Sequence, residues 1–483
     1  MSDSVLGRRD APKEISTPFT VIAEEPRNTE EKATTATKLE PEDSEADQSE
    51  DTADEKDLLT SFVPLLISMN ILGIGLSLPE EYSVRDIKKR KPCPLTLYCV
   101  WKLLVASVML TYVGYFVARE MTEITNKRRW VVSLDAVSNV ITMVSALVVQ
   151  ASMHKASDTL GRMLQKLGED TDMDFAGRVR ETEGPPLAPR TPSSSGSKIF
   201  FVTFGTWAMQ GLTVVSKLAR CYSQPPAGQT DSAIDGGAGT VDAADCLRGN
   251  GTLCSSPTAV VNFTEVAVRY GLLRGTVWMS MLLAYYSLVS IEARLKNLNV
   301  DLFLLPPPKL GSEALRTFRR THSVLCRTLK VVDASFSVCS IAWYAHCMVE
   351  TLASVDQFIA FGPGDLWCLP FRVSVALNAV CLLALMLGTS EAAHSASKKA
   401  RDSVIVLAQR SAEMPIHQPD MYEEINATLN SFRRDAVTLH CCRVWPLNRA
   451  SGLLAFLVTM AGVAVLAQHR PASREFLRPH FAL

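Results

Sequence analysis

The sequence predicts an all-helical membrane protein that crosses the bilayer seven times, with its N-terminus in the cytosol and its C-terminus outside. Two observations predict this fold class. Apolar residues make up 47% of the 483 residues and are gathered into eight blocks. Several blocks approach the roughly 20 residues that a helix needs to cross a hydrocarbon core of about 30 Å. The polar stretches between them carry glycosylation sequons and unevenly distributed Lys and Arg, which orient the crossings.

The chain begins with a polar tail, residues 1–56, which we expect to be a disordered acidic segment in the cytosol because it has almost nothing to bury. The first apolar block, 58–78, follows. It contains four residues that interrupt a helix or an apolar run, namely Pro64, Asn70, Gly73 and Gly75. We therefore predict that residues 57–94 form a broken segment that dips into the membrane without crossing it, followed by a basic cytosolic loop.

The loop 216–269 sets the number of crossings. It contains the sequons of Asn250 and Asn262, and glycan is added only on the lumenal face of the secretory pathway. If the first block crossed the membrane, this loop would lie inside, and the basic loop 79–94 would lie outside against the positive-inside rule. Seven spans remain when that block is left out. Spans one and two, residues 95–118 and 130–153, lie within 95–153. The other five are residues 199–215, 270–290, 331–353, 371–389 and 452–468.

Three loops are then cytosolic: 154–198, 291–330 and 390–451. The first contains a flexible insertion rich in Pro, Ser and Gly. The other two are basic and carry apolar stripes at helical spacing, so we expect them to form a helical anchor region, with a helix over 420–445 leading into the last span. Two details oppose this orientation: the basic run 126–129 would lie outside, and the sequon of Asn426 would lie inside.

The external loops are expected to contain four cysteines: Cys221, Cys246, Cys254 and Cys368. Four cysteines in an oxidising space can form two disulfides, and a single Cys246–Cys254 bridge or none fits the pattern equally well. The twelve cysteines include no C-x-x-C pair and no Cys/His cluster with ligand spacing, so no metal site is expected. The net charge of −1 gives no reason to expect a nucleic-acid partner.

The sequence contains no catalytic motif of the G-x-S-x-G, H-E-x-x-H or Walker type, so we expect neither an enzyme nor a cofactor. Ionisable residues within spans are more informative, because they are costly in lipid and usually face a cavity or a partner. These residues are Asp135, Arg274, Asp333, His346, Glu350 and Arg372. With aromatic residues at the same depth, they predict a pocket open to the outside that binds a small organic molecule. The candidate ligand-binding residues are Trp130, Asp135, Arg274, Trp278, Trp343, Tyr344 and His346. For each residue alone, anchoring at the membrane interface is the alternative.

Two stretches, LRTFRRTHSVLCRTLKVVDASFSVCSIAWYAHCMVETL and FRRDAVTLHCCRVWPLNRASGLLAFLVTMAGVAVLAQH, resemble the arthropod gustatory receptor family. So does the layout of residues 58–470, with a cytosolic N-terminus, a broken first segment and basic helical loops. The family's motif in its last span, T-Y-x5-Q-F, is matched here only at Gln468. The other three positions are occupied by Ala461, Gly462 and His469.

This resemblance implies a ligand-gated, non-selective cation channel in the plasma membrane that detects a small-molecule tastant. It also implies a homo- or hetero-tetramer with related receptor subunits, surrounded by membrane lipid. The last span would line the pore, with Val465 and Leu466 as a gate and Gln468 as a polar ring. Small residues in this span allow close helix approach, which would also suit a plain anchoring helix.

Two other classes of protein are the alternatives. A small-molecule transporter typically has repeated halves and paired broken helices, whereas we find no internal repeat and one broken segment. A G-protein-coupled receptor also has seven spans, but its N-terminus lies outside.

Overall fold

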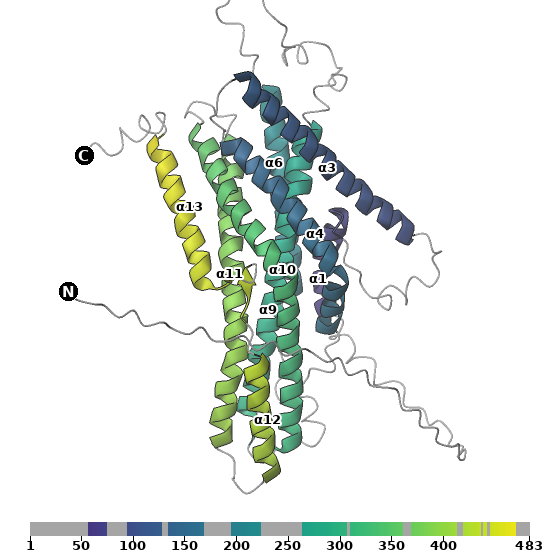
Figure 1. Cartoon of the computed structure of the whole chain (residues 1–483), viewed down its shortest axis with the longest axis vertical. Helices are drawn as coiled ribbons and strands as arrows, with labels where there is room; N and C mark the ends of the chain where they lie inside the picture. Colours follow the sequence, from purple (N-terminus) through teal and green to yellow (C-terminus); the bar gives the residue numbers. More distant parts are fainter. Residues whose placement is uncertain are drawn as a thin grey trace, which may run out of the picture. The chain divides into compact units, whose positions relative to one another are not determined.

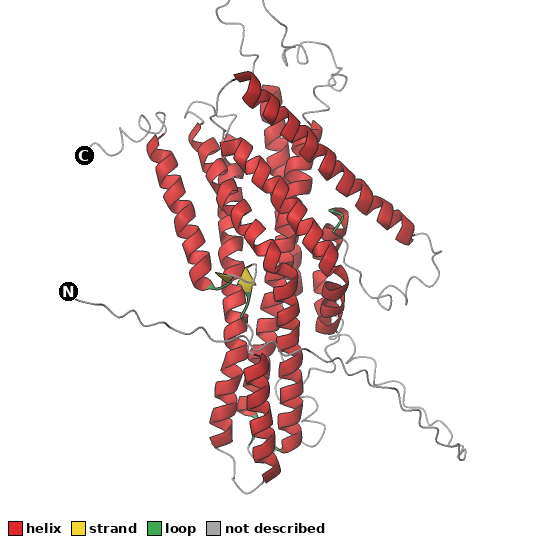
Figure 2. Cartoon of the chain, in the orientation of Figure 1, coloured by secondary structure: helices red, strands yellow, loops and turns green. Residues whose placement is uncertain are grey.

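The computed structural model is almost entirely helical in the residues that it describes (Figure 2). The described residues are 57–74, 94–127, 134–168, 195–223, 263–306, 310–360, 369–412, 419–435, 438–441 and 445–469. The elements in chain order are α1 (Asp57–Ile71), α3 (Pro94–Lys127), α4 (Leu134–Gly168), α6 (Ser195–Ser223), the π-helix η2 (Ala267–Leu273), α9 (Arg274–Leu304), α10 (Ser312–Ala360), α11 (Leu369–Ala412), α12 (Pro419–Asp435), the strands β1 (His440–Cys441) and β2 (Trp445–Pro446), and α13 (Arg449–His469). The predicted all-helical fold class is confirmed.

Six helical stretches of the described chain are long and apolar enough to cross a membrane. They are Cys99–Arg119, Ala136–Leu164, Lys198–Val215, Phe263–Leu304, Val373–Ala412 and Arg449–Gln468. The chain is therefore a multi-pass membrane protein, as predicted. The predicted fifth span, 331–353, lies within α10, which is not among the six. Helix α10 packs against α4, α9, α11 and α13, so most of its surface in this span meets neighbouring helices, and such a helix tolerates polar residues. A seventh crossing through α10 stays a prediction.

Helix α10 is the centre of the packing, and α3 and α13 lie at its edges (Figure 1). In the most apolar part of Phe263–Leu304, the stretch that contains η2 and α9, 78% of the residues are buried, compared with 22% in α3 and 11% in α13. Large apolar side chains such as Leu103 and Leu457 are exposed on these outer helices. These surfaces have the composition of helix faces that meet lipid or another membrane helix.

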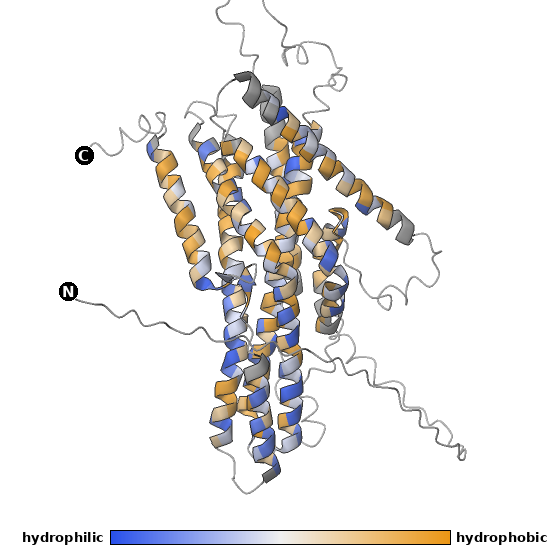
Figure 3. Cartoon of the chain, in the orientation of Figure 1, coloured by the Kyte–Doolittle hydropathy of each residue, from blue (hydrophilic) through white to orange (hydrophobic). Residues whose placement is uncertain are grey.

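Helices α9, α10 and α11 continue beyond the predicted spans and become more polar toward the end where α12 packs (Figure 3). Here the ring of Phe432 in α12 meets Phe318 edge-on, with centroids 5.9 Å apart. His322 Nε2 lies 3.1 Å from the carbonyl oxygen of Ala400 in α11. These contacts join α10, α11 and α12 into one helical bundle.

The continuous helix predicted over 420–445 is wrong, because α12 ends at Asp435 and a short β-hairpin precedes α13. The backbone N–H of His440 in β1 donates to Asp333 Oδ1 of α10 at 2.6 Å. Helix α13 then starts with a reciprocal cap, in which the side chains of Asn448 and Ser451 each accept the other's backbone N–H at 3.0 Å. In the described residues of this segment, a hairpin and a cap thus provide backbone hydrogen bonds in place of a continuous helix.

Helix α1 has 15 residues, about 22 Å of helix, which is shorter than the hydrocarbon core. Gly73 ends it with a φ of 75°, and Ile74 N–H donates to the carbonyl of Met69 at 2.9 Å. This is a Schellman turn, in which glycine supplies the left-handed residue. Trp101 Nε1 donates to the free carbonyl of Ile71 at 3.1 Å. The position of this segment relative to the membrane stays a prediction.

Candidate ligand-binding site

The predicted ligand-binding residues are distributed over α4, α9 and α10. Their positions are Arg274 and Trp278 in α9, Trp343, Tyr344 and His346 in α10, Asp135 in the first turn of α4, and Trp130 outside the described residues. The side chain of Asp135 also lies outside what the structure describes.

Arg274 forms a buried ion pair with Glu350 of α10, and their side chains are 6% and 4% exposed. Ser138 Oγ of α4 donates to the second carboxylate oxygen of Glu350 at 2.8 Å. The guanidinium carbon of Arg274 also lies 4.2 Å from the centre of the Tyr270 ring, a cation–π contact. A single charge would be very costly at such a site, so the pair and its hydrogen bond allow both residues to be buried. Glu350, which the sequence analysis leaves out of the binding set, is thus the partner of Arg274.

The π-helix η2 positions this arginine. The backbone N–H of Arg274 donates to the carbonyl of Arg269, five residues back, as in a π turn. Side chains four residues apart come closer to alignment in this wider turn, which stacks Arg274 on Tyr270. Single π turns inside α-helices occur frequently at functional sites.

The contact between α4 and α10 contains a row of three polar pairs. Ser138 meets Glu350, Thr142 Oγ1 lies 3.1 Å from His346 Nδ1, and Ser145 Oγ donates to the carbonyl of Ala342 at 3.0 Å. These positions are about one helical turn apart on two antiparallel helices. In a membrane, such hydrogen bonds hold helices together. The side chain of His346 is buried within this row, and its observed polar contact is with Thr142 of α4.

Trp343 and Tyr344 also make contacts between helices. Trp343 Nε1 donates to Ser280 Oγ of α9 at 2.9 Å, and its ring packs on Phe336. The hydroxyl of Tyr344 forms a hydrogen bond with Ser390 Oγ of α11. These two side chains therefore join α10 to α9 and to α11.

A cavity of about 920 Å³ lies between α6, α9 and α11. Trp278, Tyr285 and Tyr286 line it from α9, and Thr206 and Cys381 line it from α6 and α11. Its walls are mainly apolar with a few polar groups, and its volume is within the range of about 300–1,000 Å³ of small-molecule sites. The residues that line the cavity extend along about 28 Å of α9, from Trp278 to Asn297. The cavity is therefore deeper than the pocket open to the outside that the sequence predicts.

Of the predicted residues, Trp278 alone is among those that line this cavity. Tyr285 and Tyr286, whose ring centroids lie 5.2 Å apart in an edge-to-face arrangement, are not among the predicted residues. Two adjacent tyrosines within a span are a usable signal, because each hydroxyl needs a polar neighbour away from lipid. The cavity thus offers aromatic surface for an organic ligand and hydroxyl groups to orient it.

The predicted pore residues Val465, Leu466 and Gln468 lie near the C-terminal end of α13. Val465 and Gln468 are exposed and Leu466 is half-buried. Helix α13 touches α10 and α11 through glycine: a Cβ on Gly452 would lie 2.7 Å from Ser390 Oγ, and one on Gly462 would lie 2.9 Å from a methyl group of Leu352. Close approach through small residues is therefore a property of the inner face of α13.

The predicted glycosylation and disulfide positions are not described. Asn250, Asn262, Cys246, Cys254 and Cys368 lie outside the described residues, and Cys221 lies in α6 with its side chain undescribed. In the described part of the chain, no group of three or more His, Cys, Asp or Glu residues could hold a metal ion.

These features define a multi-pass helical membrane protein with a ligand-sized cavity between its helices. Two solved structures of the insect olfactory receptor OR5 from Machilis hrabei are similar to it. The structure in complex with eugenol has a TM-score of 0.56 at 13% identity, and a second structure has a TM-score of 0.59 at 15% identity. Each match covers 86% of this chain and 100% of the receptor chain, so the two proteins share a fold. No protein-family model and no curated protein matches the sequence.

Proposed function

We propose that the chain is a chemosensory receptor that works as a ligand-gated, non-selective cation channel in the plasma membrane. The observation that carries this proposal is the fold, shared over 86% of the chain with an insect olfactory receptor that was solved in complex with eugenol. A small organic ligand would bind in the cavity between α6, α9 and α11, where aromatic surface and hydroxyl groups coincide. Binding would favour the open state through a higher affinity for that state.

Within this class we propose a gustatory receptor that detects a tastant. The support is the resemblance of residues 315–352 and 432–469 to the arthropod gustatory receptor family. The shared fold supports the wider class of insect chemoreceptors equally well, so an odorant is the natural second ligand to test.

We further propose a homo- or hetero-tetramer with related subunits, in which α13 of each subunit faces a shared pore. The exposed apolar surface of α13, from Leu453 to Val465, supports a contact with lipid or with another subunit. Val465 and Leu466 would form the gate and Gln468 a polar ring, because a narrow apolar constriction closes a pore by dewetting.

The proposed orientation places residues 1–56 in the cytosol and glycan on Asn250 and Asn262. A tag at the N-terminus should be detected by antibody only after cells are permeabilised. Enzymatic deglycosylation should increase the mobility of the protein, and replacing both asparagines by Gln should remove that shift. Labelling of the tag on intact cells would contradict this orientation.

The function is tested by voltage clamp of cells that express the protein, with panels of tastants and odorants. We expect a cation current that persists when G-protein signalling is blocked. Uptake of the compound without current would instead indicate a transporter, and a current that requires G-protein signalling would indicate a G-protein-coupled receptor. Cells that also express related receptor subunits provide the hetero-oligomer arm of the experiment.

A further inference from the structure

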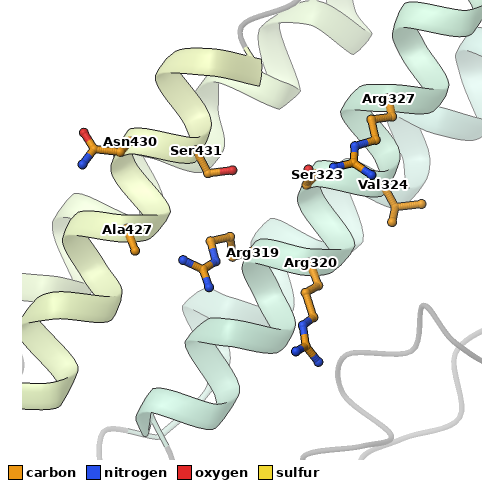
Figure 4. A pocket seen from close by; sticks show the side chains of 8 residues that line it. All are labelled: Arg319, Arg320, Ser323, Val324, Arg327, Ala427, Asn430 and Ser431. Carbon is orange, nitrogen blue, oxygen red and sulfur yellow. The ribbon is translucent and has the colours of Figure 1, made fainter. Parts of the chain in front are cut away.

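A groove of about 740 Å³ lies between α10 and α12, in the bundle that we place on the cytosolic side (Figure 4). Its polar lining residues are Arg319, Arg320, Ser323, Arg327, Asn430 and Ser431. Arg319 extends from α10 toward α12, and Ser431 extends from α12 toward α10 (Figure 4). No acidic side chain lines the groove in the described part of the chain.

The groove is more basic than its packing requires. Arg319 Nη2 forms an ion pair with Glu424 Oε1 of α12 at 2.9 Å, and this pair fixes the arginine side chain beside the groove. Arg320 and Arg327 are exposed, and among the described residues no acidic partner is found for either guanidinium. The opposite face of the same turns, which includes Phe318 and Leu325, makes the core contacts. The two exposed arginines are therefore not needed to hold the bundle together.

The basic surface continues toward the membrane. A second hollow of about 290 Å³ shares Arg327 with the groove and is also lined by Arg162 of α4. Arg162 lies within the last turn of the apolar stretch Ala136–Leu164, at the end that we place in the cytosol. Basic pockets at the cytosolic ends of membrane helices are suited to phosphorylated lipid headgroups.

We propose that this groove binds a ligand that carries two or more phosphate groups. Guanidinium groups match phosphate oxygens with two parallel hydrogen bonds, and three arginines around one hollow offer several such forks. The hydroxyls of Ser323 and Ser431 and the amide of Asn430 supply neutral groups for the remaining oxygens. Two sources have this chemistry: the headgroup of a phosphorylated inositol lipid, and a soluble inositol phosphate.

The test measures binding of both sources to the purified full-length protein. Inositol trisphosphate is titrated in solution by calorimetry. Labelled phosphatidylinositol bisphosphate is measured by energy transfer in nanodiscs of phosphatidylcholine, with phosphatidylserine nanodiscs as the control for simple charge attraction. The variant is Arg320→Gln with Arg327→Gln. The matched control is Arg401→Gln, an exposed arginine on α11 that does not line the groove.

We expect the double variant to bind the phosphate probes about tenfold or more weakly, since charge-assisted hydrogen bonds are lost, and the control to bind normally. Binding of the lipid alone assigns the headgroup as the source, and binding of the soluble probe alone assigns a cytosolic phosphate. Wild-type protein that binds neither probe, or a double variant with unchanged affinity, overturns the proposal. A change in subunit number with unchanged phosphate affinity also overturns it, because the groove would then be a contact between copies of the chain.

Discussion

Removal of the Glu350 carboxylate should strongly destabilise the protein. In Glu350→Ala, the guanidinium of Arg274 stays in a site where its side chain is only 6% exposed, next to Tyr270 and without its counter-ion. Breaking a buried pair on one side costs about 3–5 kcal/mol, because an uncompensated charge is left behind. Ser138 also loses the acceptor of its hydrogen bond, which adds to the cost.

The matched control is the pair of Arg119 and Glu265, whose side chains are 42% and 20% exposed at a distance of 2.9 Å. Since solvent screens this pair, Glu265→Ala should cost at most about 1 kcal/mol. Replacing both buried partners, as Arg274→Met with Glu350→Leu, should restore most of the stability lost in Glu350→Ala, because neither charge is then left alone.

The free energy of unfolding is measured for the purified variants in mixed micelles, with increasing fractions of a denaturing detergent. Tryptophan fluorescence reports the transition. If Glu350→Ala and Glu265→Ala cost the same, or if the double replacement is no more stable than Glu350→Ala, the reasoning from burial is refuted.

Three glycine substitutions test other parts of the structure. Gly205 lines the cavity, and a Cβ at this position would meet nothing within 4 Å. Gly205→Leu should therefore raise the half-maximal ligand concentration about tenfold, whereas the control Gly211→Leu on the same helix should not. Equal dose–response curves for the two variants would argue against this cavity as the binding site. Gly452→Val should destabilise the contact of α13 with Ser390 by about 1–3 kcal/mol in the same unfolding assay, and unchanged stability would show that α13 does not pack as described. Gly73→Ala should cost about 1–2 kcal/mol, because an L-residue is strained at a φ of 75°; no loss there would contradict the left-handed turn.

The helical membrane architecture was predictable from sequence because the signals are local. A membrane helix must satisfy its own backbone hydrogen bonds and bring apolar side chains to lipid, so a long apolar run nearly determines it. The exception is α10, which carries Asp333 and Glu350 and is shielded by its neighbours. Its lower hydropathy is tolerated because those neighbours cover most of its surface.

The site was only partly predictable. Arg274 and His346 were recognisable because ionisable residues inside apolar runs need a partner. Their partners could not be read from the sequence: His346 and its partner Thr142, for example, are 204 positions apart. The helix predicted over 420–445 failed for a similar reason, since Asp333 of α10 accepts a hydrogen bond from the hairpin that replaces its last turns.

The sequence by itself thus determined that the chain is a helical membrane protein, and it showed ionisable residues within apolar runs and a basic segment between them. Only the tertiary structure decided that Arg274 meets Glu350, that a cavity lies between α6, α9 and α11, and that Arg320 and Arg327 face a groove beside α12. The physical reason is that hydropathy and helix length depend on neighbours along the chain. Cavities and ion pairs depend on which helices pack together, and residues far apart in the sequence set that packing.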